Sequence, residues 1–176
     1  MFYIIFQSYY GFFRIFFCIL FKLLQKGKEG FIMDENINLT ILNEIAKAGK
    51  MGMNSITYVS EKVENENIRE NLTTQYTGYG NILEKVNTQF EQYGEIPDDE
   101  KWSTKMMTWT GIQMNTMMDK SDSHIAELMI QGNIMGVIEM QKLLNHNPHA
   151  EQTVKDIMHE FVTFQNNNLE KWKEYL

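Results

Sequence analysis

The chain has 176 residues, a formal net charge of −7 at pH 7 and a pI near 5.1. Its acidity argues against a nucleic-acid-binding protein, because contacts to phosphates need clustered lysine and arginine. The single cysteine, Cys18, excludes a disulfide framework or a site built from several thiolates. No glycine-rich phosphate loop, G-x-S-x-G or H-E-x-x-H motif occurs in the sequence.

The first 32 residues differ in composition from the rest of the chain. Half of all aromatic residues lie in this segment, which is also basic, whereas residues 33–176 are strongly acidic. We therefore divide the sequence into an apolar N-terminal segment, 1–32, and a body, 33–176. The body is long enough for one domain with its own core.

The N-terminal segment has the length of a membrane anchor, since about 20 apolar residues span a bilayer. Gln7, Ser8 and Arg14 interrupt its apolar run, however. As an anchor it would lie in the inner membrane with the body in the cytoplasm, because lysines follow the apolar run. A signal peptide is excluded, because no basic region precedes the run and no cleavage site of small residues follows it.

A second interpretation is that residues 1–32 are an untranslated leader read as protein. The codons for Lys28-Glu29-Gly30 can contain AAGGAGG, a bacterial ribosome-binding sequence, at ordinary spacing before the ATG codon of Met33. On this hypothesis Met33 is the true start, and the segment is set aside before the fold is considered. We expect membrane contact only if residues 1–32 are translated.

The body is predicted to be helical throughout. Apolar residues recur every three or four positions in five segments: 34–64, 66–94, about 100–118, 123–146 and 150–176. Asp34 and Ser121 are suitable N-caps, and Gly94 is a suitable stop. No segment alternates with the period of a strand.

The predicted core faces include several residues whose positions the structure can test. We place Ile37, Tyr76 and Ile138 in the apolar stripes of the first, second and fourth segments. Gly49 and Gly52 lie on or beside the first stripe. Because glycine costs about 1 kcal/mol in a helix interior, we expect a neighbouring helix to approach closely there.

The connections suggest a topology. A short joint near Asn65 makes the first two long helices antiparallel neighbours, and the last two helices form a similar hairpin. Residues 95–122 are long enough to return along the bundle, which predicts an all-α, ferritin-like four-helix bundle with a short crossover helix between the second and third long helices. An up-down array of five helices is the alternative.

Three stretches carry a family resemblance. The segment from Ser121 to Gly136 (SDSHIAELMIQGNIMG), the segment from Gln75 to Tyr79 (QYTGY) and the closing Leu169 to Lys173 (LEKWK) resemble motifs of small bacterial ferritin-like four-helix-bundle proteins of unknown function. The resemblance covers 34–176. It implies the fold and no known activity.

Ferritin-like enzymes bind two iron ions through four glutamates and two histidines, in part as Glu-x-x-His pairs. The second long segment contains no histidine, and the last one has only Asp156 and His159 at this spacing. Glu127 or Glu139 on the preceding segment could join them, which makes half of an iron site at best. The alternative is that Asp156 and His159 are a solvated pair one turn apart. We therefore expect no metal site, with Glu127, Asp156 and His159 as the weak candidates.

These observations favour a cytoplasmic, non-enzymatic helical bundle. It would act through an interaction surface or by forming a homo-oligomer, because no catalytic constellation is complete and no cofactor motif is present. The first alternative is an iron-binding ferritin-like protein or oxidoreductase with a degenerate site. The second is a helical bundle tethered to the membrane by residues 1–32.

Overall fold

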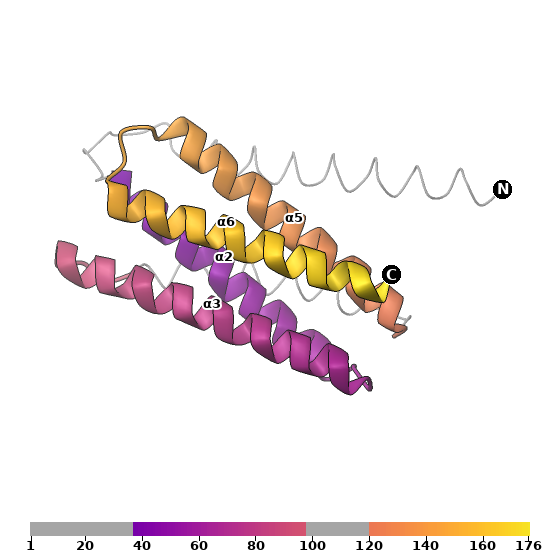
Figure 1. Ribbon diagram of the computed structural model, residues 1–176. Helices are drawn as coiled ribbons and strands as arrows, with labels where there is room; N and C mark the ends of the chain where they lie inside the picture. Colours follow the sequence, from indigo (N-terminus) through magenta and orange to yellow (C-terminus); the bar gives the residue numbers. More distant parts are fainter. Residues whose placement is uncertain (1–36, 98–119) are drawn as a thin grey trace, which may run out of the picture. The chain divides into compact units, whose positions relative to one another are not determined.

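The computed structural model describes residues 37–97 and 120–176 (Figure 1). In these ranges the chain forms the helices α2 (Ile37–Ser60), α3 (Glu66–Tyr93), α5 (Asp122–His146) and α6 (Gln152–Trp172), and the 3-10 turn η1 (Lys173–Tyr175) follows α6. The described residues contain four long helices and no strand, which confirms the prediction of an all-helical bundle.

Several predictions lie outside the described residues. They are the cap at Asp34, the helix at about 100–118 and the leader or anchor at 1–32. Within the part of the chain that the structure describes, none of the helices combines the length and hydrophobicity needed to cross a membrane.

Local side chains and backbone conformation determine where the helices begin and end. The Asn65 side chain accepts a hydrogen bond from Asn67 N at the start of α3, and the Ser121 side chain accepts one from His124 N at the start of α5. These bonds satisfy amides that have no partner within the helix. Helix α3 ends at Gly94, whose φ of 72° lies in the left-handed region that glycine adopts without strain.

The helices form two antiparallel hairpins, because α2 and α3 are joined by residues 61–65 and α5 and α6 by residues 147–151. Hydrogen bonds join the hairpins at both ends. Asn65 Nδ2 donates to Asp122 Oδ2 at 2.6 Å, and Tyr93 Oη donates to Glu151 Oε2 at 2.8 Å. Because Asn65 and Asp122 meet, α3 and α5 begin at the same end of the bundle.

The core lies between the four helices and contains Trp172, Phe90 and Phe161 as its largest fully buried apolar side chains. Burying each such side chain stabilises the fold by roughly 1.5–3 kcal/mol. A Cβ atom built on Gly52 would lie 2.2 Å from Tyr79 Cζ. The close approach expected at Gly52 therefore occurs, and the side chain of Tyr79 makes it.

Three residues predicted to lie in the core are instead exposed to solvent over nearly half of their surface: Ile37, Tyr76 and Ile138 have exposed fractions of 42%, 41% and 45%. In α3 the position beside Tyr76, Gln75, is buried instead. Hydrophobicity alone puts Tyr76 inside and Gln75 outside. The packing reverses this because partners on other helices satisfy the Gln75 amide.

Candidate functional site: a buried amide network

The polar side chains buried in the described bundle share one chemical type. All of them are carboxamides: Asn38, Gln75, Asn133, Gln165 and Asn168. Burying an amide without a hydrogen bond costs about 1–3 kcal/mol, so each needs a partner in the interior. The partners of these amides define the site.

Gln75 on α3 is the centre of the network. Its Nε2 donates to Asn133 Oδ1 on α5 at 2.9 Å, and its Oε1 accepts from Trp172 Nε1 on α6 at 2.7 Å. Both bonds are fully buried. One amide therefore joins three helices and satisfies the indole N–H of the largest core side chain.

A second buried bond lies one turn along α3. Tyr79 Oη donates to Gln165 Oε1 on α6 at 3.1 Å, and the tyrosine ring packs edge-on against Phe164 with centroids 4.9 Å apart. Burial raises the pKa of Tyr79, while hydrogen bonds to Gln165 and Gln75 oppose the shift. The phenol is therefore neutral and acts as a hydrogen-bond donor.

Two glycines create the space that these side chains occupy. A Cβ on Gly136 would lie 2.6 Å from Gln165 Nε2, and a Cβ on Gly78 would lie 2.2 Å from the ring of Phe164. Side chains at these positions would displace the partners of Tyr79. Glycine at 78 and 136 therefore lets α3, α5 and α6 approach closely enough for the network to form.

The network contains no carboxylate, imidazole or ammonium group. Its only ionisable member is Tyr79, which burial keeps protonated. Carboxamides do not ionise near neutral pH, and they bring no charge to balance that of a metal cation. Asn133 Nδ2 is buried without an acceptor among the described residues, so the network contains one further donor. The arrangement can orient helices and hold a neutral polar group, but it lacks an acid–base pair.

A second polar cluster closes the end of the bundle where α6 begins. Asn38 Nδ2 donates to Glu151 Oε1 at 2.7 Å, and Glu151 N donates to Asn38 Oδ1 at 3.0 Å. Tyr93 donates to the other carboxylate oxygen of Glu151. Desolvation raises the pKa of Tyr93 to about 12, and the hydrogen bond and charge of Glu151 add to the shift. This cluster connects α2, α3 and the start of α6.

The structure does not bring the predicted metal candidates together. Glu127, Asp156 and His159 are all exposed. Glu127 lies 3.7 Å from His124 Nδ1, and Asp156 accepts a hydrogen bond from Gln152. Glu127 is near the start of α5, and Asp156 and His159 are near the start of the antiparallel α6, so at least about 20 Å along the bundle separates them.

Iron, the metal that the ferritin-like resemblance implies, does not fit this set of residues. An iron pair needs carboxylates and histidines that converge inside the bundle, and the three candidates are exposed and far apart. Within 37–97 and 120–176, no group of three or more histidine, cysteine, aspartate or glutamate side chains could hold a metal ion.

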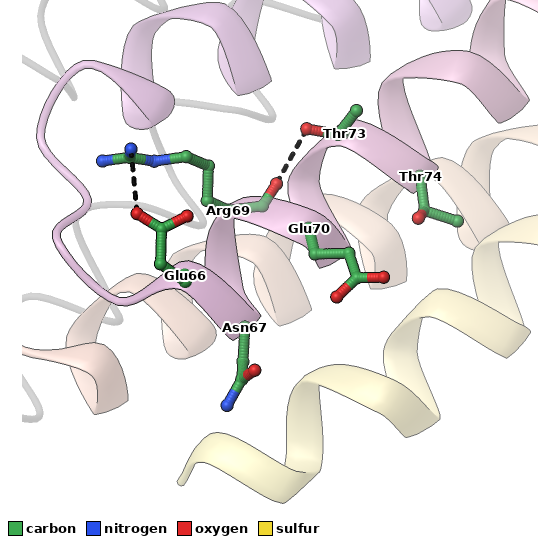
Figure 2. Close-up of a pocket in the computed structure, with 6 residues that line it drawn as sticks. All are labelled: Glu66, Asn67, Arg69, Glu70, Thr73 and Thr74. Atoms are coloured by element: carbon green, nitrogen blue, oxygen red, sulfur yellow. Dashed lines mark hydrogen bonds and ion pairs between the residues drawn. The ribbon is translucent and has the colours of Figure 1, made fainter.

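An open depression on the surface lies at the start of α3 (Figure 2). Its six lining residues all belong to the first turns of this one helix: Glu66, Asn67, Arg69, Glu70, Thr73 and Thr74. Arg69 pairs with Glu66 at 3.3 Å and donates to Val63 O at 2.6 Å. Thr73 donates to Arg69 O. These groups bond to one another locally and do not converge on a shared point, so the depression is a feature of one helix surface.

Hydrophobicity does not identify the network residues. Their phase along the helices makes them candidates for burial, although Tyr76 is equally in phase with Leu72 and Tyr79 and is exposed. Gln75 lies three residues after Leu72 and four before Tyr79. Asn133 follows Met129 by four residues, and Gln165 follows Phe161 by four. Each amide therefore continues an apolar stripe. A polar residue in phase with a stripe is a candidate for a buried hydrogen bond, and its partner has to come from the structure.

The described helices and their interior define a four-helix bundle with a neutral polar seam. No protein-family model, curated protein or solved structure matches this chain significantly.

Proposed function

We propose that this protein is a non-enzymatic, ferritin-like helical bundle of the cytoplasm that acts by contact with proteins, a second copy of itself included. The observation that carries the proposal is the chemistry of the interior. Where a ferritin-like enzyme has carboxylates and histidines, the described bundle buries carboxamides, with Gln75 and Asn133 at their centre.

The positions of the helix ends support the ferritin-like topology. Helices α3 and α5 begin at the same end, so the chain has to return along α3 before α5 starts. This distance is about 42 Å for 28 residues. Residues 95–121 can reach roughly 90 Å when extended, which leaves length for a crossover helix.

The stretches that carry the resemblance also support the proposal. Gln75 and Tyr79 lie in the stretch QYTGY, Asn133 and Gly136 in the stretch SDSHIAELMIQGNIMG, and Trp172 in the closing stretch LEKWK. The three stretches therefore meet at the network in the interior. Because these residues position helices, a shared motif would reflect a shared fold.

Acidity supports a protein as the partner and argues against a nucleic acid, since residues 33–176 carry an excess of aspartate and glutamate. The body contains no cysteine, and cytosolic proteins do not need disulfides. Both observations agree with a cytoplasmic interaction protein.

Metal analysis tests the proposal. The protein is expressed with added iron, purified without chelators and measured for bound metal, alongside His159→Ala and the matched variant His149→Ala. We expect substoichiometric metal in all three. Stoichiometric metal that is lost in His159→Ala and kept in His149→Ala would establish the iron-binding alternative and overturn the proposal.

A further inference from the structure

The buried side chain of Asn133 has a hydrogen-bond donor without a partner. Asn133 is 1% exposed, and its Oδ1 accepts from Gln75 Nε2 at 2.9 Å. Its Nδ2, in contrast, has no acceptor among the described residues. A buried amide donor is costly to leave unpaired, and a bound small molecule is a common way to satisfy it.

Trp172 determines which end of Asn133 is left over. An indole N–H can only donate, so the atom of Gln75 that it meets must be the oxygen, Oε1. Gln75 therefore presents its Nε2 to the oxygen of Asn133. Rotating either amide by 180° would set two donors against each other. The group that would complete the network is therefore a hydrogen-bond acceptor.

A second amide donor lies close to Asn133 where α5 meets α6. Tyr79 takes the Oε1 of Gln165, and the Nε2 of Gln165 faces α5. A Cβ on Gly136 would lie only 2.6 Å from this Nε2. Gly136 follows Asn133 by one turn on the same face, and Cβ positions so spaced are about 5–6 Å apart. One small molecule can therefore bridge Asn133 Nδ2 and Gln165 Nε2.

Direct hydrogen bonds already connect these two amides by another route. Gln75 bonds to Asn133 and also to the hydroxyl of Tyr79. The same hydroxyl donates to Gln165. An acceptor between Asn133 and Gln165 would close these bonds into a ring that joins α3, α5 and α6.

The middle of α5 offers space and an acceptor for such a molecule. In the described segment from Gly132 to Ile138, only Asn133 is fully buried, and a Cβ on Gly132 would meet nothing within 4 Å. The carbonyl oxygen of Gly132 accepts the helical bond from Gly136 N and keeps a second lone pair, which no side chain at position 136 covers. The position therefore offers two amide donors and one carbonyl acceptor.

From the unpaired Asn133 donor and the second donor beside it, we infer that a water molecule is bound in the interior between Asn133 Nδ2 and Gln165 Nε2. Water accepts from both amides and donates to the Gly132 carbonyl, and three hydrogen bonds are typical of a buried water. An anion would also accept, but the network holds no cation to balance its charge. The site is independent of the proposed function, so the metal analysis and the tests below can fail separately.

A crystal structure of the full chain, at a resolution that shows ordered waters, tests the position. We expect density for one atom about 2.7–3.2 Å from both amide nitrogens. In Gly136→Ala the new Cβ displaces Gln165 Nε2, so this density should be lost. Gly132→Ala is the matched control and should keep it, because its Cβ meets nothing within 4 Å. No density at this position in the wild-type protein, or a protein group that accepts from Asn133 Nδ2, would overturn the inference.

Nuclear Overhauser effects between water and side-chain amide protons test the site in solution, on 15N-labelled protein. We expect Asn133 to show the signal of a long-lived bound water, and Gln165→Leu to weaken it several-fold. Asn168 is the internal control, because it is 3% exposed and its Nδ2 already donates to Phe164 O at 2.9 Å. Equal signals at Asn133 and Asn168, or a signal at Asn133 that Gln165→Leu and Gly136→Ala leave unchanged, would refute the bridging water.

Discussion

The substitution Gly52→Ala tests the close packing of the Tyr79 ring against helix α2. In Gly52→Ala the new Cβ would lie 2.2–2.7 Å from three ring atoms of Tyr79, whereas ordinary contact begins near 3.4 Å. The ring must therefore move by more than about 1 Å. It is confined by Phe164 and by the bond from its hydroxyl to Gln165.

The expected magnitude combines three effects. Overpacking costs about 1–3 kcal/mol, and a lost or lengthened bond to Gln165 costs about 0.5–1.5 kcal/mol. Alanine returns about 1 kcal/mol through its higher helix propensity. We therefore expect Gly52→Ala to lower the free energy of unfolding by about 2 kcal/mol.

Urea unfolding followed by circular dichroism measures this change. Gly132→Ala on α5 is the matched control, because a Cβ there meets nothing within 4 Å. The control should raise the stability by about 0.5–1 kcal/mol. In a Tyr79→Leu background the loss caused by Gly52→Ala should shrink, because the ring is gone. A Gly52→Ala protein as stable as the Gly132→Ala protein would refute the packing argument.

Three further predictions concern single side chains. Trp172→Phe removes the donor to Gln75 and leaves space in the core, so it should lower the free energy of unfolding by about 2–4 kcal/mol. Urea titration measures this change, and Leu176→Ala, at an exposed position, is the control that should change little. The pKa values of Tyr79 and Tyr93 are raised above 10.0 in the folded state, that of Tyr93 to about 12. Their contribution to the free energy of unfolding is therefore complete below pH 10 and is lost as the pH rises toward 12. Over this pH window, urea titrations of Tyr93→Phe should show a smaller loss of stability than those of the wild-type protein. Gly94→Ala should cost about 1–2 kcal/mol because φ is 72° there, and an unchanged urea midpoint would contradict the left-handed cap.

The helices could be predicted from the sequence because their signals are local. The predicted segment 66–94 agrees with Glu66–Tyr93, and 123–146 agrees with Asp122–His146. The caps at Asn65 and Ser121 and the stop at Gly94 act within a few residues of the helix ends. Each capping residue lies within three residues of the amide that it bonds, so a short stretch of sequence contains the whole interaction.

The amide network could not be predicted in the same way, because its partners are distant in sequence. Gln75 is buried by Asn133, 58 residues away, and by Trp172, 97 residues away. Hydrophobicity predicts that Tyr76 is buried and Gln75 exposed, which is the reverse of what the structure shows. The reversal depends on hydrogen bonds that exist only after the two hairpins have docked.

The distance along the chain between Gln75 and Trp172 has a consequence for synthesis. At roughly 5–20 residues per second, the ribosome adds Trp172 about 5–20 s after Gln75. Once α3 has been synthesised, the α2–α3 hairpin can form from local contacts, but the apolar face that will meet α6 remains uncovered. The nascent hairpin is therefore open to chaperones and to neighbouring nascent chains until the last helix arrives.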